Sequence, residues 1–172
     1  MTQRIAALRP PSKPSMTVGR STSAALCRSL ARVAIIIGSF TWIGVANADC
    51  LDDAAKYHRV DSMLLRSIAM QESGMRPWVT NRNGNGSEDL GLMQINSIHL
   101  PRLGRYGITR AHLFDGCINA YVGAWILREN IQRFGPTWKA VGAYNASSPD
   151  KQLRYATQIH ARWQALQRAA LR

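Results

Sequence analysis

The chain has 172 residues, and its 22 lysine and arginine residues against ten aspartate and glutamate residues give a formal net charge of +12. This length suffices for one compact domain with a buried core. The sequence contains no nucleic-acid-binding motif, so we expect no nucleic-acid partner despite the positive charge. The four histidines are scattered without the spacing of metal ligands, so we expect no metal site and no cofactor.

The first 48 residues have the pattern of a secretory signal peptide. They contain six lysine or arginine residues and no acidic residue, and a 13-residue apolar run occupies positions 33–45. Ala46 and Ala48 then place small residues at the −3 and −1 positions of a cleavage site. An uncleaved membrane anchor is the alternative, but the apolar run is short for spanning a bilayer. We therefore expect export from the cell interior and a mature chain of residues 49–172.

Charge and cysteine content further define this mature chain. It carries 16 basic and ten acidic residues, and its net charge of +6 suits a protein that acts on an acidic polymer such as a cell wall. The same charge is equally compatible with a merely soluble surface. Cys27 lies in the leader, which leaves Cys50 and Cys117. Two cysteines in an oxidising compartment allow one pairing, so we predict a Cys50–Cys117 disulfide.

The elements expected in the mature chain are mainly helical. A short helix is expected at 50–58, and a second at 62–73 with Asp61 as its N-cap. Two Asn-Gly pairs within 79–92 predict a small β-hairpin or an irregular loop. Helical structure is expected to resume around 94–96. The remaining predicted helices lie at 110–114 after a Thr109 cap, from an Asp115 cap to about Phe134, from Thr137-Trp138 to Tyr144, and at 151–168.

The helix predicted at 62–73 ends its apolar face with a carboxylate. Leu65, Ile68, Ala69 and Glu72 have the i, i+3, i+4, i+7 spacing that places side chains on one stripe of an α-helix. One interpretation is a frayed last turn, because Gly74 is a typical helix stop and Glu72 can turn into water. The other is a partly buried carboxyl group whose raised pKa lets it donate a proton near neutral pH.

Three short motifs occur in order along the chain. They are Glu-Ser at 72–73, Gly-Leu-Met-Gln-Ile-Asn at 91–96 and Ala-Tyr-Asn at 143–145. Together they resemble the catalytic domain of soluble lytic transglycosylases, which cleave peptidoglycan, and the resemblance spans nearly all of residues 50–163. It implies a mainly α (α+β), lysozyme-like fold with a small β-hairpin beside the active-site cleft.

Within that family the chain most resembles small exported members found with type III secretion systems and with pilus or conjugation machines. Those members pair cysteines at the positions of Cys50 and Cys117, and the stretch 96–109 is similar to theirs. The resemblance implies a monomer whose partners are peptidoglycan glycan strands and components of such an apparatus. It implies cleavage of the β-1,4 bond between N-acetylmuramic acid and N-acetylglucosamine with 1,6-anhydro ring formation, to open the wall locally during assembly. Two alternatives remain, a lysozyme-like muramidase that uses water and a non-catalytic wall-binding scaffold.

A second resemblance concerns residues 80–97, which are similar to the β-hairpin region of c-type lysozymes. In those enzymes an aspartate follows the acid glutamate at the separation found here between Glu72 and Asp89, which is 17 residues. Glu72 is then expected to protonate the leaving oxygen, and Asp89 to stabilise the positive transition state. Asp89 is alternatively a turn or cap aspartate. Asn81 and Asn83 are expected either to orient Asp89 or to form the turn.

The other motif residues are predicted to contact the substrate. The full set is Ser73, Asn81, Asn83, Met93, Gln94, Ile95, Asn96, Tyr144 and Asn145. Met93 is expected to wall the cleft, with core packing as the alternative for Met93 and Ile95. The family's Tyr-Asn motif places the hydroxyl of Tyr144 beside the acid glutamate. The chain departs from the family pattern by carrying Ser147 where glycine is common, so no substrate contact is inferred beyond Asn145.

Overall fold

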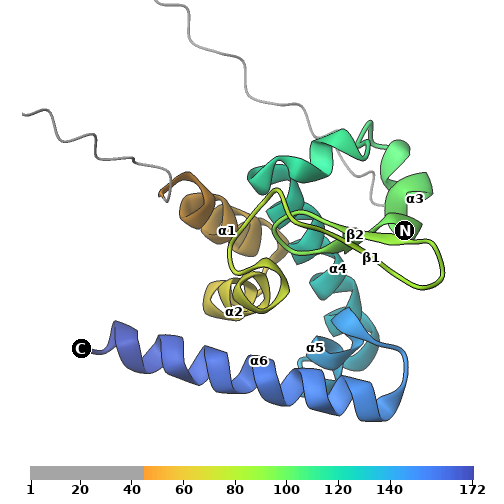
Figure 1. Ribbon diagram of the computed structural model, residues 1–172. Coiled ribbons are helices and arrows are strands. Elements are labelled where there is room, and N and C mark those ends of the chain that lie inside the picture. The colour runs from red at the N-terminus through yellow and green to blue at the C-terminus, as the bar shows by residue number, and fades with distance from the viewer. Residues whose placement is uncertain (1–44) are drawn as a thin grey trace, which may run out of the picture. The chain divides into compact units, whose positions relative to one another are not determined.

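The computed structural model describes residues 45–172, with side chains described from Cys50 onward (Figure 1). The predicted signal peptide, with its alternative of a membrane anchor, lies outside the described residues except at its last four positions. Those positions form the start of helix α1 (Val45–His58), which therefore begins earlier than the predicted 50–58. Among the described residues, no helix is long and apolar enough to cross a membrane.

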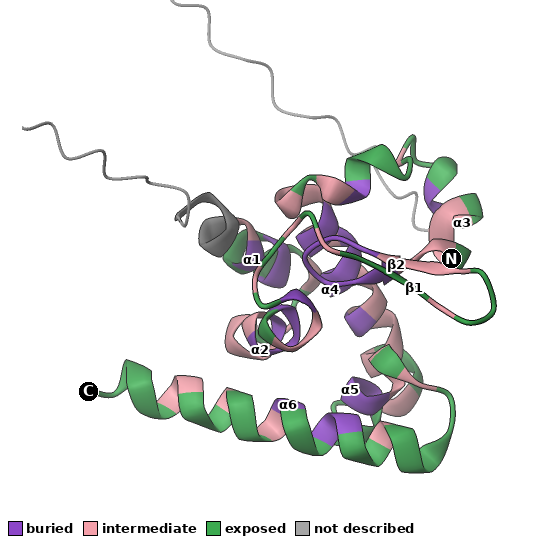
Figure 2. Cartoon of the chain, in the orientation of Figure 1, coloured by how far each residue is buried: buried purple, intermediate pink, exposed green. Residues whose placement is uncertain are grey.

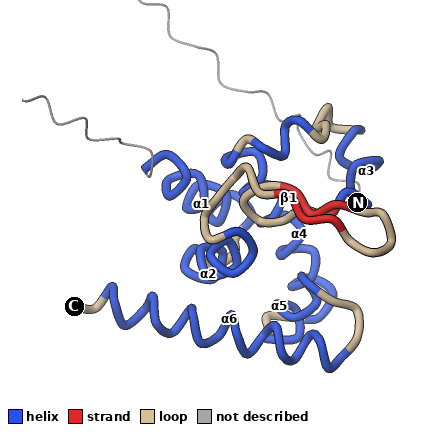
Figure 3. The backbone as a smooth tube through the Cα atoms, in the orientation of Figure 1, coloured by secondary structure: helices blue, strands red, loops and turns tan. Residues whose placement is uncertain are grey.

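Helices dominate the described part of the chain, and one small sheet accompanies them (Figure 3). The α-helices after α1 are α2 (Ser62–Ser73), α3 (Leu100–Gly104), α4 (Gly116–Phe134), α5 (Trp138–Asn145) and α6 (Pro149–Ala170). Two 3₁₀ helices are η1 (Ser97–His99) and η2 (Ala111–Phe114). The strands are β1 (Thr80–Arg82), β2 (Glu88–Leu90) and β3 (Ile95–Asn96), which form an antiparallel sheet in the order β1-β2-β3.

Helix α2 has the predicted bounds because both of its ends are capped. The Asp61 side chain accepts a hydrogen bond from the backbone N–H of Leu64 at 2.6 Å. Gly74 follows the last residue with a left-handed φ of 60°, and its N–H bonds back to carbonyls of the last turn. These two caps fix the place along the chain at which Glu72 ends the buried face.

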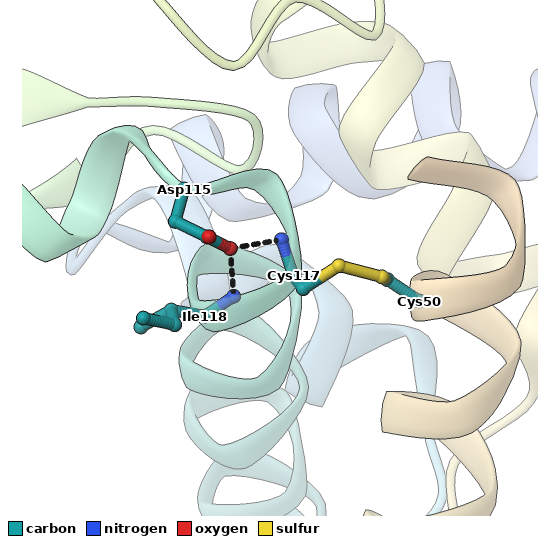
Figure 4. The surroundings of a disulfide bond; sticks show 4 residues. All are labelled: Cys50, Asp115, Cys117 and Ile118. Carbon is teal, nitrogen blue, oxygen red and sulfur yellow. Dashed lines mark hydrogen bonds between the residues drawn. A yellow bond between two sulfur atoms is a disulfide. The ribbon is translucent and has the colours of Figure 1, made fainter. Parts of the chain in front are cut away.

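The long helix α4 begins at the predicted cap and is tied covalently to α1. One carboxylate oxygen of Asp115 accepts hydrogen bonds from the backbone N–H groups of Cys117 and Ile118, at 2.8 and 2.9 Å (Figure 4). Cys117 forms a disulfide with Cys50, and their Cα atoms are 5.0 Å apart. The start of α4 is therefore fixed both by a cap and by a link to α1.

The prediction that helical structure resumes around 94–96 is wrong. Ile95 and Asn96 form β3, in which Ile95 pairs with Leu90 and Asn96 pairs with Asp89. A tight turn at 91–94 reverses the chain after β2, and Gly91 takes a φ of 77° there. A strand of two residues is too short to show a two-residue periodicity, so its sequence pattern gives no signal.

Two helix starts also differ from the predictions. The short helix predicted at 110–114 is η2, which begins at Ala111 without a side-chain cap, while the N–H of Thr109 donates to Nδ1 of His112. Helix α6 begins at Pro149, two residues earlier than predicted, which suits a residue that favours the first helical turn.

The core gathers around α4, which packs against α1 and α5, while α6 packs along α5 and α2. Figure 2 shows buried positions on α1, α2, α4 and α5, whereas α6 is largely exposed. Completely buried side chains include Leu65 and Ile68 of α2, Leu92 of the turn after β2, Leu127 of α4 and Ile159 of α6. The packing brings the end of α2, the sheet and the first half of α6 together.

Candidate active site

Glu72 lies at the end of a stripe that is fully buried. Leu65, Ile68 and Ala69 are each 0% exposed, and Glu72 is partly buried beyond them. Burial raises the pKa of the Glu72 carboxyl from 4.5 to about 7, and the negative charge of Asp89 also raises it. A hydrogen bond from Tyr155 acts in the opposite direction on this pKa. The carboxyl group is consequently poised to give and take a proton near neutral pH.

Tyr155, a residue of α6 outside the predicted motifs, contacts this carboxyl directly. Its hydroxyl donates a hydrogen bond to Oε1 of Glu72. Tyr155 is 5% exposed, and burial together with the Glu72 charge raises the pKa of its phenol far above the usual range. The phenol therefore stays a neutral donor. Its only sequence signal was its place on the apolar face of α6 with Ile159, which indicates packing rather than contact with an acid.

Tyr144 lies close to the same carboxyl, but its hydroxyl bonds to the loop after β2. It donates to the carbonyl oxygen of Met93 at 3.0 Å. Burial raises the pKa of Tyr144 well above the usual value, and the charges of Glu72 and Asp89 raise it further. The tyrosine of the Tyr-Asn motif thus fixes the motif containing Met93, while Tyr155 makes the direct contact with Glu72.

The Asp89 carboxylate is held by two side-chain amides. Nδ2 of Asn96 donates to Oδ1 at 2.6 Å, and Nδ2 of Asn83 donates to Oδ2 at 3.0 Å. Asp89 and Asn96 are direct neighbours across β2 and β3, and Asn83 lies in the turn between β1 and β2. Hydrogen-bond donors to both oxygens fix the orientation of the carboxylate.

Asn81 orients a different residue. It pairs with Asp89 across β1 and β2, but its Nδ2 donates to Oε1 of Gln94 at 2.6 Å. Nε2 of Gln94 donates in turn to the carbonyl oxygens of Val79 and Gly91, at 3.1 and 2.8 Å. Gln94 is 8% exposed, so in this structure its amide mainly ties the sheet to the turn after β2.

Three predicted substrate contacts are buried. Met93 is 0% exposed and Ile95 is 1% exposed, so both belong to the core, which was the alternative reading for each. Ser73 is 2% exposed, and its hydroxyl donates to the carbonyl oxygen of Leu92 at 2.6 Å while accepting from the N–H of Arg76 at 3.0 Å. A sugar contact by Ser73 would require its hydroxyl to change partners.

Asn145, unlike these three residues, is exposed, and Gln152 holds the turn that follows it. Asn145 is exposed at the last position of α5, and its side chain makes no hydrogen bond within the described residues. Nε2 of Gln152 donates to the carbonyl oxygens of Ala146 and Ser147, at 2.9 and 3.2 Å. Since Ser147 has no positive φ, the turn does not require the glycine that is common at this position of the family.

Asn119 of α4 supports the turn after β2 and was not found by sequence reasoning. It is 0% exposed, and its Oδ1 accepts from the N–H of Met93 at 2.7 Å. Its Nδ2 donates to the carbonyl oxygens of Leu90 and Leu113, at 2.8 and 2.7 Å. A polar residue on a helix gives no indication of the loop it will meet, so only the tertiary structure could reveal this role.

Comparison with known proteins decides the family. The family model described as the Transglycosylase SLT domain matches residues 49–161. The chain belongs to this family. It is 45% identical over 129 residues to the invasion protein IagB of Salmonella typhimurium, covering 72% of this chain and 81% of that protein. It is 40% identical over 124 residues to the protein IpgF of Shigella sonnei, covering 69% of this chain and 82% of that protein.

A solved structure supports the fold. An inactive mutant of the lytic transglycosylase Slt from Pseudomonas aeruginosa superposes with a TM-score of 0.57 at 21% sequence identity. The match covers 70% of this chain and 24% of the Pseudomonas protein, which is therefore much longer. The predicted mainly helical, lysozyme-like fold is confirmed, with a three-stranded sheet in place of the predicted hairpin. As a member of the SLT family, the chain is a peptidoglycan lytic transglycosylase.

Proposed function

We propose that this enzyme cleaves the β-1,4 bond between N-acetylmuramic acid and N-acetylglucosamine and closes a 1,6-anhydro ring, with Glu72 transferring both protons. The observation that carries the proposal is the Glu72 carboxyl, whose pKa is raised to about 7 at the end of a buried helical stripe. A carboxyl group with this pKa is present in both protonation states near neutral pH. One residue can therefore serve as acid and then as base.

In the first step, protonated Glu72 donates its proton to the glycosidic oxygen as the bond from that oxygen to C1 breaks. The sugar acquires oxocarbenium character, and its positive charge is stabilised by the Asp89 carboxylate or by the substrate's own N-acetyl oxygen. In the second step, the Glu72 carboxylate takes the proton of the 6-hydroxyl of the same muramoyl sugar, and that oxygen bonds to C1. The carboxyl is regenerated, and no water is consumed.

The alternative is a muramidase, in which Glu72 activates water in the second step. Asp89 favours this alternative, because its two amide donors hold a carboxylate of the kind that lysozyme-like hydrolases use. Both outcomes use the same two side chains. Exclusion of water and placement of the 6-hydroxyl decide between them.

The products distinguish the two outcomes. Peptidoglycan should be digested with the enzyme and with Glu72→Gln, and the released fragments identified by mass spectrometry. Fragments ending in 1,6-anhydromuramic acid, absent with Glu72→Gln, support the proposal. Fragments with reducing muramic ends, also absent with the variant, identify a hydrolase.

The biological task we propose is local opening of the wall for a secretion or pilus apparatus by an enzyme exported to the periplasm. Support comes from the resemblance to small exported transglycosylases and from the relative that is named an invasion protein. Glycan strands are the substrate, and components of the apparatus are the proposed partners. A signal peptide at 1–48 and an enzymatic domain at 49–172 complete this proposal.

A secretion assay tests the task separately from the chemistry. Cells that lack the gene should be supplied with the wild-type protein or with Glu72→Gln, and secretion measured. Restoration by the wild type alone supports catalytic opening of the wall. Full restoration by both proteins would instead favour the wall-binding scaffold.

A further inference from the structure

A cavity of about 370 Å³ lies at the end of α2 that is remote from Glu72. It opens where Asp61 caps the start of α2, which is about 15 Å along the helix axis from Glu72. Helix α6 passes both places, because Tyr155 bonds to Glu72 and Nε1 of Trp163 donates to the Asp61 carboxylate at 3.0 Å. None of the predicted site residues lines this cavity.

Apolar and aromatic side chains form much of its wall. Leu64, Ile131 and Val141 contribute aliphatic surface. The rings of Trp138 and Trp163 have centroids 5.8 Å apart, and Trp138 is 39% exposed. Tryptophan in a concave, partly exposed position is typical of binding sites and is enriched among the residues that dominate protein interfaces.

Two arginines, Arg59 and Arg128, line the same cavity. Neither Arg59 nor Arg128 makes a side-chain hydrogen bond or ion pair within the described residues. Among the described residues, Asp61 is the only acid on the wall, and its carboxylate already accepts from the N–H of Leu64 and from the indole of Trp163. The cavity therefore combines apolar surface with two guanidinium groups that no carboxylate in residues 45–172 binds.

The backbone conformation of Arg59 supports a role for its side chain in this cavity. Arg59 follows the last residue of α1 with a φ of 55°, a left-handed conformation that helix ends usually assign to glycine. A long cationic side chain is thus present where the backbone favours a residue with none.

We propose that this arginine–tryptophan pocket binds a segment of a partner protein that presents an aspartate or glutamate next to a large apolar side chain. A carboxylate forms paired hydrogen bonds with a guanidinium group, and the apolar side chain displaces water from the aliphatic and indole surface. The charge of the pocket argues against two other occupants. The leader of this chain has six basic residues and no acid, and a second copy carries the same net positive charge as the first.

The proposal separates partner binding from bond cleavage, because the pocket and Glu72 occupy opposite ends of α2. Substitutions in the pocket should weaken partner binding and leave the basal release of peptidoglycan fragments unchanged. This holds whether Glu72 closes an anhydro ring or activates water, so failure of one proposal does not imply failure of the other.

Selection from a displayed library of short random peptides, with the purified full chain as target, tests the pocket. We expect the recovered peptides to share an acidic residue beside Leu, Ile or Phe. Synthetic copies should bind about tenfold more weakly to Arg128→Gln, the scale expected for loss of one strong interface side chain. Arg59→Gly should have a similar effect, and it removes the guanidinium while suiting the left-handed backbone. Arg133→Gln, on the same helix as Arg128 but outside the pocket, should bind as the wild type does.

Nuclear magnetic resonance locates the bound peptide. Binding should shift the indole N–H signal of Trp163 and leave signals around Tyr144 unchanged. The proposal is overturned if no peptide is recovered, if the recovered peptides lack acids, or if Arg128→Gln binds them as tightly as the wild type. Concentration-dependent dimerisation that Arg128→Gln abolishes would also overturn it, because the occupant would then be a second copy.

Discussion

The Tyr155 hydroxyl, on α6, donates a hydrogen bond to the Glu72 carboxyl at the end of α2. The two residues are 83 positions apart in the chain, and the packing of α6 along α2 brings them together. Burial raises the pKa of Glu72, and this hydrogen bond moderates the rise. Tyr155 therefore helps to orient the proposed acid and limits the rise of its pKa.

Substitution Tyr155→Phe should raise the pKa of Glu72 further, because burial and the Asp89 charge remain when the hydrogen bond is lost. We expect the alkaline limb of the pH–rate profile to move up by about one unit, the equivalent of one hydrogen bond of about 1.4 kcal/mol. Turnover below this limb should fall about tenfold, because the carboxyl is less well positioned. Tyr57→Phe, at an exposed tyrosine, is the control. An unchanged alkaline limb would exclude the proposed role of Tyr155.

The wild-type enzyme should lose activity as the pH rises through about 7. The first step needs protonated Glu72, and the protonated fraction falls tenfold per pH unit above its pKa of about 7. Values of kcat/KM on soluble glycan fragments from pH 5 to 9 measure this dependence. A profile that stays flat from pH 6 to 8 would contradict the role of Glu72 as acid.

The titration of Glu72 should also make the free energy of unfolding depend on pH, in a direction fixed by its raised pKa. The folded-state pKa of about 7 exceeds the ordinary value of 4.5, so the stability that Glu72 contributes is fully present below pH 4.5. It is lost as the pH rises to about 7, by about 3 kcal/mol in total. The free energy of unfolding of Glu72→Gln, relative to that of the wild type, should therefore increase from pH 4.5 to about pH 7 and stay constant above it. Urea unfolding at pH 4, 6 and 8 tests this, and a constant difference would contradict it.

Asp89→Asn should lower activity and move the alkaline limb in the opposite direction from Tyr155→Phe. The negative charge of Asp89 raises the pKa of Glu72, so its removal lowers that pKa. Loss of the charge that we propose to stabilise the transition state should reduce turnover about a hundredfold. Asp150→Asn, at an exposed acid at the start of α6, serves as the matched control. Retention of full turnover would leave Asp89 only a structural role in the sheet.

The turn after β2 should tolerate no side chain at Gly91. A Cβ atom there would lie 2.1 Å from the backbone oxygen of Leu113, at a φ of +77°. We expect Gly91→Ala to destabilise the fold by about 3 kcal/mol or more. Gly123→Ala should cost less, because its Cβ would meet the flexible Met93 side chain, and Gly84→Ala should be nearly neutral because its Cβ would meet nothing within 4 Å. Thermal unfolding of the three variants tests this order, and equal costs would contradict it.

Local sequence signals predicted α2 and the place of Glu72, because caps and helical periodicity act over a few residues. The start of α4 followed from Asp115 for the same reason. The motif residues identified the family, but Met93 and Ile95 proved to be core residues. A motif records which residue types a site needs without separating those that contact substrate from those that support them.

The parts that sequence could not reveal depend on contacts between distant segments. Asn119 meets the turn after β2 from 26 positions away, and Tyr155 meets Glu72 from 83 positions away. Strand β3 has only two residues and owes its conformation to pairing with β2. Such features follow from how the elements pack, which periodicity and capping signals do not encode.

The central claim is that Glu72 is a carboxylic acid with a pKa near neutrality, and ¹³C NMR of chain labelled at the glutamate carboxyl carbons tests it most directly. The chain has only three glutamates, Glu72, Glu88 and Glu129. We predict that one signal titrates at about pH 7 and is missing from Glu72→Gln. The signal of Glu88, whose pKa is lowered mainly by its hydrogen bond with Arg110, should titrate below the usual range in the same spectra. If the signal that is missing from Glu72→Gln titrates between about pH 3.5 and 5, within the ordinary range for glutamate, the account of Glu72 is contradicted.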